Sequence, residues 1–279
     1  MSKKIKLVLS GSGTKFPVFI GALRRLEQGG YEVEAVAGTS GGAIVAAGIA
    51  SGYTSSHELE DLVRRIMPRL PKLVRPSLVS LIQNFGFFKT KKLQKVFKDE
   101  LIEKMGDSTV LCKIITVNVD ASGTEDTVTV WSSRRHPDQS LPLVTAASMS
   151  IPFVFQQVLI NGDDHVDGGL LKNFAIDVFG DDRNVVGLTF SGKLASEKEI
   201  PWYRPVSRLV NRGLRLLDLV LVRNVREDIE DAKYATSIHV TTSIGGLDFK
   251  MTDEKITQMI QDGYDSIDEY LSVNGDLLS

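Results

Sequence analysis

The sequence contains one cysteine, almost no net charge and no long apolar run. Cys112 is the single cysteine of 279 residues, so the chain forms no internal disulfide, and the apolar run LCKIITV around it predicts a small buried core residue. The net charge of −2 excludes a general attraction to nucleic acid or to anionic surfaces. No run reaches the roughly 18 apolar residues of a membrane span, and IKLVL near the amino terminus is too short for a signal-peptide core. We therefore expect a cytoplasmic protein.

Nothing in the composition or in the order of residues divides the chain. Hydrophobic residues make up 42% and charged residues 24%, which is ordinary for a globular protein with a full core. The length suits one large domain or two small ones. No internal repeat, low-complexity tract or Gly/Ser-rich linker marks a boundary, so we expect one domain over residues 1–279.

The first fifty residues alternate between two kinds of pattern. Buried strands are predicted at residues 5–9 (IKLVL) and 33–37 (VEAVA), and helices at 17–28 and 43–50. Short turns that contain glycine join these elements, and this order of strands and helices predicts a parallel sheet flanked by helices. Further along the chain we predict a proline-broken helical region over 57–98, a helix over 92–105, a hairpin of 113–120 and 127–133, a helix over 141–150, a strand and turn over 154–162, a strand over 184–190, a helix over 206–234, a strand over 238–243 and a helix over 253–272.

A serine stands between glycines where the second predicted strand is followed by its helix. Gly38-Thr39-Ser40-Gly41-Gly42 fits the pattern G-x-S-x-G in the strand–turn–helix context that a nucleophile elbow requires. Glycines on both sides leave room for neighbouring backbone, and the free N–H groups and the dipole at the helix start favour negative charge near Ser40. The alternative is that Thr39-Ser40 only caps the helix, and the pentapeptide by itself does not decide between the two.

A second glycine-rich turn, Gly11-Ser12-Gly13, lies between the first predicted strand and its helix. In a parallel sheet the carboxyl ends of neighbouring strands share an edge, so backbone N–H groups of this turn can face a substrate carbonyl above Ser40. The same turn resembles a dinucleotide-binding G-x-G-x-x-G, but Phe16 stands in place of the last glycine, and the G-K-[ST] of a phosphate P-loop is absent. We therefore expect an oxyanion-binding turn here.

The candidate base for Ser40 is an aspartate. The four histidines lack the sequence context of a catalytic triad: His57, His136, His165 and His239. Asp167 stands directly before Gly168-Gly169, a pattern that holds a carboxylate in a tight loop and that also occurs in ordinary turns. In the first case the carboxylate faces the nucleophile with no histidine between them.

Four segments, in this order, resemble the patatin-like phospholipase family. They are LVLSGSGTKFPVFIGAL (the oxyanion segment), AVAGTSGGAIVAAGIASG (the nucleophile elbow), AASMSIPFVFQQV (a wall of the substrate site) and HVDGGLLKNFAIDV (the D-G-[AG] segment), and the final DGYDSIDEYL is similar to the family's closing helix. The resemblance spans most of the chain, with the family's order and spacing. It implies a three-layer α/β/α fold with a mainly parallel central sheet, and hydrolysis of acyl esters of lipids without a metal or another cofactor.

The resemblance also implies roles for individual residues. It implies a catalytic dyad of Ser40 and Asp167, and an oxyanion hole at Gly11, Ser12 and Gly13, which take the positions of the family's G-G-G. The residues that support these motifs are Lys15, at the position of the family's basic residue, and Gly38, Gly42, Gly168 and Gly169. Two positions depart from the family pattern. Ser12 replaces a glycine, which predicts strain wherever the backbone needs a positive φ, and Phe16 either narrows the acyl site or packs in the core.

Two stretches combine basic residues with apolar ones. Between residues 64 and 98 ten Lys or Arg occur without an Asp or Glu, interleaved with apolar residues such as Phe85 and Phe88. Residues 202–226 carry six arginines against one acid, Asp218, and begin with Trp202-Tyr203. Such patterns suit an anionic phospholipid surface, although a solvated basic helix face has the same composition. We expect peripheral binding to phospholipid membranes and, in the absence of a nucleic-acid motif, no nucleic-acid partner.

The leading hypothesis is an intracellular serine hydrolase of the phospholipase A type that forms an acyl-enzyme on Ser40. One alternative is an acyltransferase or thioesterase, which passes the same acyl group to an acceptor other than water. Another is a catalytically impaired lipid-binding protein, which Ser12 and Phe16 motivate. Labelling of Ser40 by a fluorophosphonate distinguishes an enzyme from the binding protein, and product analysis with mixed lipids distinguishes hydrolase from transferase.

Overall fold

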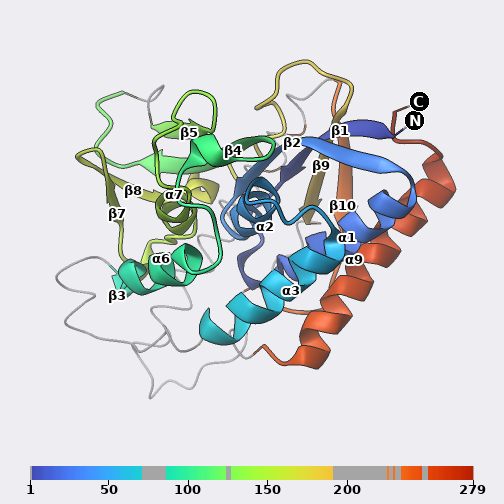
Figure 1. The fold of residues 1–279 in the computed structure, drawn as a ribbon, viewed down its shortest axis with the longest axis horizontal. Helices are drawn as coiled ribbons and strands as arrows, with labels where there is room; N and C mark the ends of the chain where they lie inside the picture. Colours follow the sequence, from blue (N-terminus) through green and yellow to red (C-terminus); the bar gives the residue numbers. More distant parts are fainter. Residues whose placement is uncertain are drawn as a thin grey trace.

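A mixed sheet runs through the middle of the molecule (Figure 1). The computed structural model describes residues 2–70, 86–123, 127–190, 225, 229, 234–246 and 251–278, and this part of the chain contributes eight strands to the sheet. They are β1 (Lys3–Leu9), β2 (Tyr31–Thr39), β4 (Leu111–Asn118), β5 (Val128–Ser132), β7 (Val158–Ile160), β8 (Asp163–Asp167), β9 (Val185–Phe190) and β10 (Thr236–Val240). Hydrogen-bonded neighbours follow the order β10, β9, β1, β2, β4, β8, β7, and β5 pairs with the edge of β4 that faces away from β2.

The sheet has a parallel part and an antiparallel part. Strands β10, β9, β1, β2 and β4 are parallel, whereas β5, β7 and β8 add antiparallel pairs beyond and beside β4. The predicted α/β fold with a mainly parallel sheet is confirmed, and the predicted hairpin is the β4/β5 pair. A separate small parallel sheet is formed by β3 (Gly86–Phe88) and β6 (Phe153–Phe155).

Helices cover one face of the sheet, the face turned toward the viewer in Figure 1. They are α1 (Pro17–Gln28), α2 (Gly41–Ala50), α3 (Ser56–Ile66), α6 (Thr90–Lys98), α7 (Leu141–Ser148) and α9 (Asp253–Asn274), with short 3-10 turns at Gly13–Lys15, Met67–Arg69, Met105–Asp107 and Gly168–Leu170. Helix α2 is buried along its whole length because it contains only Gly, Ala, Ile and Val. Helices α3 and α9 bury one apolar side each and keep charged residues on the other.

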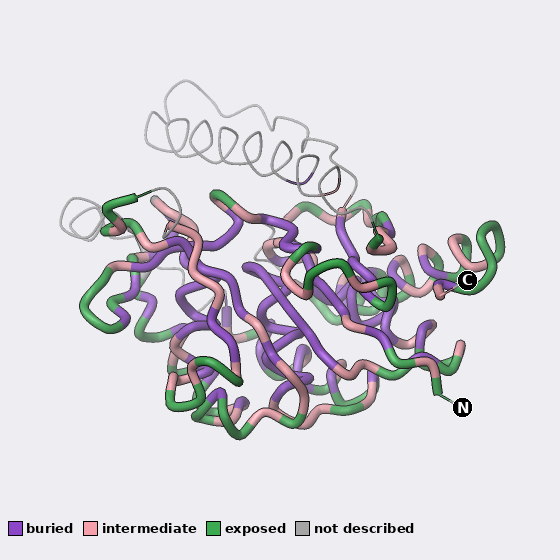
Figure 2. Tube along the Cα trace, turned by 90° about the horizontal axis from the view of Figure 1, so that it is seen from above, coloured by how far each residue is buried: buried purple, intermediate pink, exposed green. Residues whose placement is uncertain are grey.

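Successive residues of the central strands face opposite sides of the sheet. In β1, Leu7 and Leu9 join the core under the helices, whereas Val8 joins a smaller core on the other face. Cys112 is fully buried under the helices, as predicted, and burial raises the pKa of its thiol to about 12. The smaller core is completed by residues 174–176 and by Val225, while most of the helix predicted over 206–234 lies outside the described residues. Figure 2 shows the outcome, with buried strands at the centre and exposed connections around them.

One predicted helix is shorter than expected. The helix predicted over 92–105 corresponds to α6, which ends at Lys98. Beyond it the backbone bonds to another segment, since Leu141 N donates to the Glu103 carbonyl and Met105 N donates to the Gln139 carbonyl. Met105 is fully buried at the start of a separate 3-10 turn, so this apolar residue packs in the core without belonging to α6.

Two strands approach each other end to end along one edge of β4. Strand β2 pairs with residues 111–115, ending with Thr39 opposite Ile115, and β8 pairs with residues 116–118, ending with Asp167 opposite Thr116. Both lie on the same edge, because β5 occupies the other edge at residues 113–117. Strand β2 is parallel to β4 and β8 is antiparallel, so their carboxyl ends meet. This junction brings Ser40 to Asp167, although 127 positions separate them in the chain.

Candidate active site

Ser40 occupies a sharp turn between β2 and α2. Its backbone angles are φ 52° and ψ −124°, and among the described non-glycine residues only Ser40 and Asn161 have a positive φ. Such a conformation is unfavourable for a residue with a side chain and persists only where the surroundings enforce it. Here the fully buried helix α2 packs directly behind the turn, so the core holds the strained geometry that the G-x-S-x-G pattern predicts.

The hydroxyl of Ser40 is hydrogen-bonded to the carboxylate of Asp167. Ser40 Oγ donates to Asp167 Oδ2 at 2.7 Å, and the other carboxylate oxygen, Oδ1, accepts from Gly169 N at 2.7 Å. Ser40 is 5% exposed and Asp167 is 3% exposed, so water screens their interaction little. The backbone of Gly169 therefore fixes one oxygen and leaves the other directed at the serine.

Burial shifts the pKa of Asp167 upward. Removal of the carboxylate from water raises its pKa from 3.8 to about 7, and the hydrogen bonds from Ser40 and from Gly169 N oppose this shift. Near neutral pH the group is thus divided between its ionised and neutral forms. An ordinary aspartate, with a pKa of about 4, is a weak base, whereas a base with a pKa close to the working pH accepts a proton most effectively.

The turn of residues 11–13 lies directly against the Ser40 turn. A Cβ atom on Gly41 would lie 2.3 Å from Ser12 Oγ and 2.4 Å from the Gly13 carbonyl oxygen, so only glycine fits there. The positive φ of the 11–13 turn, 57°, occurs at Gly13, whereas Ser12 has φ −136°. The strain expected at Ser12 is therefore absent, because its φ lies on the side that residues with a side chain ordinarily adopt.

The three predicted oxyanion residues differ in whether their N–H groups already have a hydrogen-bond acceptor. Gly11 N donates to the Asn173 carbonyl at 2.9 Å, so the prediction that Gly11 supplies an oxyanion donor is wrong for this state of the molecule. The N–H groups of Ser12 and Gly13 have no hydrogen-bond acceptor among the described residues. Two donors thus remain available, in the turn where the sequence predicts them.

Asn173 contacts the site although the sequence did not single it out. Its side-chain Oδ1 lies beside Gly11, where a Cβ would come within 2.1 Å of it. Asn173 Oδ1 and Ser12 Oγ are both buried without a hydrogen-bond partner in the described part of the chain. An unsatisfied buried polar atom costs about 1–3 kcal/mol, and such atoms call for a functional or structural explanation. The only signal in the sequence is the position of Asn173 inside the segment HVDGGLLKNFAIDV.

Ser148 is a second contact that sequence reasoning missed. Its hydroxyl accepts from Ser40 N at 2.9 Å and donates to the Ile115 carbonyl at 2.7 Å. The N–H of the strained serine is thereby satisfied by a side chain of α7. No spacing rule connects residue 148 with residue 40, and only the position of Ser148 within the segment AASMSIPFVFQQV marked it at all.

The remaining motif residues surround the pair. Lys15 points toward Phe190, with Nζ 3.9 Å from the ring centroid, and Phe16 is fully buried in the main core, which is the second of its two predicted roles. Three glycines lie where a Cβ would come within 2.4–2.5 Å of a backbone oxygen: Gly38, Gly42 and Gly168. These positions accept no larger residue without movement of the backbone.

His165 is buried close to Asp167 but has other partners. Its Nδ1 lies 3.0 Å from Thr116 Oγ1, and its ring packs edge-on against Trp131. Burial lowers its pKa, while the nearby Asp163, Asp120 and Asp164 oppose that shift. Within the described ranges, no group of three or more His, Cys, Asp or Glu side chains has the arrangement of a metal site.

Comparisons with known proteins show which proteins this chain is similar to. A family model described as patatin-like phospholipase matches residues 7–179. Protein YqhO of Bacillus subtilis (strain 168) is 30% identical over 285 residues, which cover 92% of this chain and 94% of that protein. Patatin-like phospholipase domain-containing protein 7 of Mus musculus is 29% identical over 182 residues, covering 62% of this chain and 12% of the mouse protein.

A solved structure supports the fold. The crystal structure of VipD from Legionella pneumophila aligns with a TM-score of 0.58 at 17% identity, and the alignment covers 98% of this chain and 67% of that one. At this identity the similarity concerns the fold alone. The family model, by contrast, includes both the serine turn after β2 and the aspartate at the end of β8. On this evidence, the chain belongs to the patatin-like phospholipase family.

Proposed function

We propose that this protein is a serine hydrolase that cleaves fatty acyl esters of membrane phospholipids, with Ser40 as nucleophile and Asp167 as general base. Membership of the patatin-like phospholipase family supports lipid ester hydrolysis. The observation that carries the finer assignment is the 2.7 Å bond from Ser40 Oγ to Asp167 Oδ2 in a nearly water-free turn. A serine and a base within hydrogen-bond reach are the minimum that acyl-enzyme chemistry requires.

Acylation of the serine is the first step. Ser40 Oγ attacks the ester carbonyl carbon while its proton passes to Asp167 Oδ2, and the carbonyl oxygen becomes a tetrahedral oxyanion. The N–H groups of Ser12 and Gly13 are the donors available to hold that oxyanion, and each such donor is worth about 3 kcal/mol in related chemistry. Collapse of the intermediate breaks the ester bond, and the leaving alcohol takes the proton from Asp167.

In deacylation, water becomes the attacking group and Ser40 becomes the leaving group. A water molecule gives its proton to Asp167 and attacks the acyl group on Ser40, and the same N–H groups hold the second oxyanion. The fatty acid leaves and Ser40 recovers its proton. Transfer to an alcohol or an amine in place of water would make the protein an acyltransferase, and this alternative uses the same two side chains.

The dyad is tested with two variants and a covalent probe. Ser40→Ala and Asp167→Asn each remove one partner of the bond, so we expect at least about a 1,000-fold loss of phospholipid hydrolysis with a retained thermal unfolding transition. A fluorophosphonate is expected to label the wild type and not Ser40→Ala. Hydrolysis near the wild-type rate in either folded variant would refute the assignment. Products from mixed lipids then report whether water or another acceptor receives the acyl group.

The positions of Ser12 and Phe16 weaken the hypothesis of a non-catalytic lipid-binding protein. It rested on Ser12 and Phe16, but Ser12 takes a negative φ, its N–H has no acceptor among the described residues, and Phe16 lies in the core. Neither departure removes a group that the proposed mechanism uses.

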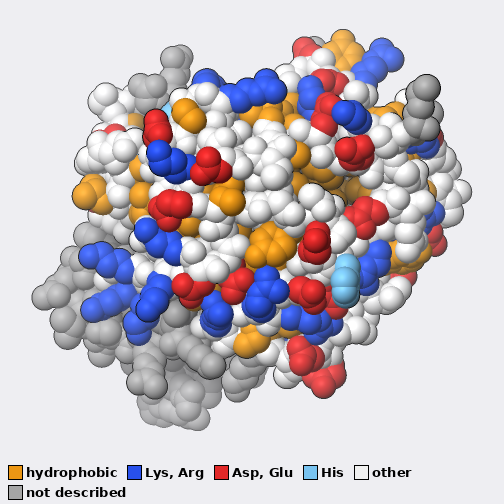
Figure 3. Space-filling model, viewed as in Figure 1, with side chains coloured by type: hydrophobic (Ala, Val, Ile, Leu, Met, Phe, Trp, Pro, Cys, Tyr) orange, Lys and Arg blue, Asp and Glu red, His pale blue; other side chains and the backbone are white. Residues whose placement is uncertain are grey.

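The second part of the proposal is that the protein docks on membranes through the exposed lysines of α6. Lys91, Lys92, Lys95 and Lys98 are exposed on this helix, while Leu93, Val96 and Phe97 are buried on its other side. Figure 3 shows Lys and Arg side chains gathered over α6. Lys98 Nζ lies 3.6 Å from Glu103 Oε1, so the docking charge comes mainly from Lys91, Lys92 and Lys95. Lysines on one helix face attract anionic lipid headgroups, each contributing about 1 kcal/mol near the surface. No helix in the described segments has both the length and the apolar character to cross a membrane.

Fewer basic side chains of residues 64–98 are available to bind a membrane than the sequence suggests. Three arginines of this stretch form ion pairs with carboxylates from elsewhere: Arg64 with Glu60 and Asp253, Arg65 with Glu100, and Arg69 with Asp99 and Glu100. Residues 71–85 and nearly all of 202–226 lie outside the described residues. The docking proposal therefore rests on α6.

Vesicle cosedimentation tests docking. Lys91→Glu with Lys95→Glu is expected to weaken binding to anionic phospholipid vesicles at least about tenfold, and added salt is expected to weaken the wild type in the same direction. Lys4→Glu makes the same kind of charge change on an exposed residue at the amino end of β1 and should have no effect. Binding that ignores both the α6 lysines and the anionic lipid content would contradict docking through this helix.

A further inference from the structure

The 11–13 turn is also held by residues 245–246, which come late in the chain. Thr14 N, directly after the turn, donates to the Gly246 carbonyl at 2.7 Å, and Thr14 Oγ1 donates to the Gly245 carbonyl at 3.4 Å. The contact is close, since a Cβ on Gly13 would lie 2.1 Å from Gly246 O. The direction of the Ser12 and Gly13 N–H groups therefore depends on where residues 245–246 stand.

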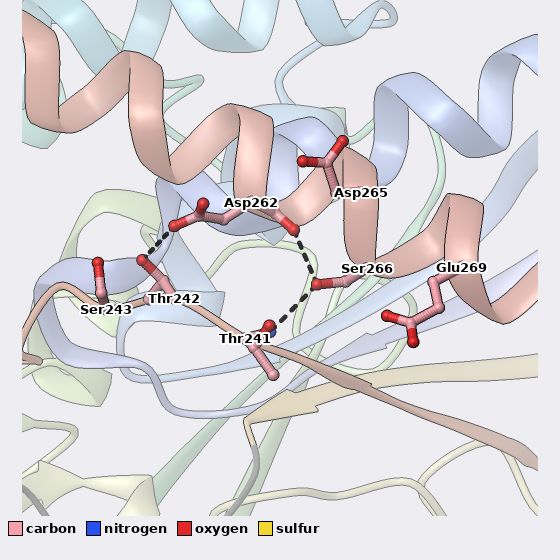
Figure 4. Close-up of a pocket in the computed structure, with 7 residues that line it drawn as sticks. All are labelled: Thr241, Thr242, Ser243, Asp262, Asp265, Ser266 and Glu269. Carbon is pink, nitrogen blue, oxygen red and sulfur yellow. Dashed lines mark hydrogen bonds between the residues drawn. The ribbon is translucent and has the colours of Figure 1, made fainter.

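Residues 241–246, which we name the 241–246 loop, leave the sheet after β10 and are fixed by α9. Thr242 Oγ1 donates to Asp262 Oδ2 at 2.7 Å and accepts from Ile244 N at 3.3 Å, so one hydroxyl ties the loop both to α9 and to itself. Thr241 N adds a bond to Ser266 Oγ at 3.2 Å. Figure 4 shows these side chains lining an open pocket of about 400 Å³ between the loop and α9, with the Thr242 hydroxyl directed at Asp262.

We propose that Thr242 and Asp262 are positioning residues for the proposed hydrolysis: their hydrogen bond fixes the 241–246 loop, and the loop fixes the 11–13 turn that binds the oxyanion. This rests on the proposed function. Neither side chain touches Ser40 or Asp167. The connection runs from Asp262 to Thr242, from Thr242 to Ile244 N and along the loop backbone to Gly246, whose carbonyl accepts from Thr14 N. A small rotation of the 11–13 turn is enough to misdirect its two donors, because an oxyanion donor acts only at about 2.7–3.1 Å from the developing charge.

The hydrogen bond between Thr242 and Asp262 lies outside the apolar contacts that hold α9 on the core. Helix α9 packs on the core through Ile256, Met259, Ile260 and Ile267, all buried, whereas Asp262 and Thr242 are only partly buried at the edge of the pocket. Loss of the bond removes no apolar contact and leaves both groups within reach of water. We therefore expect its loss to alter the 11–13 turn much more than the thermal stability of the protein.

The experiment compares matched variants of the full chain. Thr242→Val keeps the shape of the side chain and removes the hydroxyl, Thr242→Ser restores the hydroxyl, and Asp262→Ala removes the other partner. Asp265→Asn is the control, because Asp265 lines the same pocket but bonds to Gln261 on its own helix. The measurements are kcat and KM on phospholipid vesicles, the unfolding temperature, and hydrogen exchange of the Thr14 amide.

For Thr242→Val and Asp262→Ala we expect about a tenfold lower kcat, KM within twofold of the wild type and at least fivefold faster exchange of the Thr14 amide. Thr242→Ser and Asp265→Asn should match the wild type in all three. Unchanged kcat or unchanged Thr14 exchange in folded Thr242→Val and Asp262→Ala would overturn the positioning role. Exchange needs no activity, so a wild type without hydrolysis would reject the proposed function, while the exchange data would still decide whether this bond holds the turn.

Discussion

The two halves of the candidate site are built in different ways. One half comes from a continuous stretch, residues 3–50, in which β1, the 11–13 turn, α1, β2, the Ser40 turn and α2 follow one another. The other half comes from separate places in the chain: Ile115 on β4, Ser148 on α7, Asp167 on β8 and Asn173 beyond it. The first half contains the proposed nucleophile and oxyanion donors, and the second contains the proposed base and the groups that hydrogen-bond to the pair.

Different forces fix the geometry of the two halves. In the first half the geometry is steric, because glycines at positions such as Gly41 allow two turns to touch and α2 packs behind the strained serine. In the second half it is electrostatic, because burial sets the proton affinity of Asp167, the Ser148 hydroxyl accepts a hydrogen bond from Ser40 N, and Gly169 N donates one to Asp167. Changes in the first half should act through shape, and changes in the second through charge and hydrogen bonding.

Among changes that leave Ser40 and Asp167 in place, the largest effect is expected from added bulk in the first half. Gly41→Ala would put a methyl group 2.3 Å from Ser12 Oγ and 2.4 Å from the Gly13 carbonyl oxygen, so the 11–13 turn must move away from Ser40. We expect at least about a 100-fold loss of phospholipid hydrolysis, the scale of a lost oxyanion donor. Steady-state kinetics measure it, and Gly123→Ala, where no atom of the described residues lies within 4 Å of the new Cβ, is the control. A Gly41→Ala enzyme within a few-fold of the wild type would contradict the steric account.

The next effect is a pH dependence that belongs to the second half. Because the pKa of Asp167 is raised to about 7, the fraction of ionised base falls as the pH drops below 7. We expect kcat/KM to decline about tenfold per pH unit below pH 6 and to level off above pH 8. An apparent pKa near 4 in the pH–rate profile would show that burial does not tune this base.

The same shift predicts a pH-dependent stability. The folded-state pKa lies above the unfolded value, so the folded protein binds the proton more tightly, and the free energy of unfolding falls as the pH rises from about 4 to about 7. Over this range the free energy of unfolding falls by about 4 kcal/mol. Asp167→Asn has no charge to bury, so urea unfolding should find it more stable than the wild type at pH 8, and this gain should vanish below pH 4. Parallel pH profiles for the two proteins would reject the shift.

The smallest effect is expected from a hydrogen bond in the second half. Ser148→Ala leaves the N–H of Ser40 without its acceptor, and an unsatisfied buried donor costs about 1–3 kcal/mol. We expect a loss of about tenfold in kcat with a modest drop in unfolding temperature. Ser150→Ala is a matched control, since its equally buried hydroxyl bonds to the Ala146 carbonyl and does not touch Ser40. Equal losses of kcat in the two variants would mean that Ser148 only stabilises the fold.

Sequence reasoning succeeded where the signal is local. The bounds of α1 agree with the predicted 17–28, and the strand–turn–helix around Ser40 occurs where the pattern G-x-S-x-G predicts it. It failed where partners are distant. The Gly11 N–H is occupied by Asn173, and the helix expected to reach residue 105 ends at Lys98 because its backbone bonds to residues 137–141. Three arginines that suggested a free basic surface are paired with carboxylates from other segments.

By itself, the sequence determined the α/β class, the nucleophile turn and the identity of the candidate base, because glycine sterics and hydrophobic periodicity act between near neighbours in the chain. Only the tertiary structure decided that β2 and β8 meet end to end along β4, which is what brings the carboxylate to the serine. It also decided the proton affinity of Asp167, since that depends on how completely distant segments exclude water from it. Burial and strand pairing are properties of the assembled chain, and no short stretch of residues contains them.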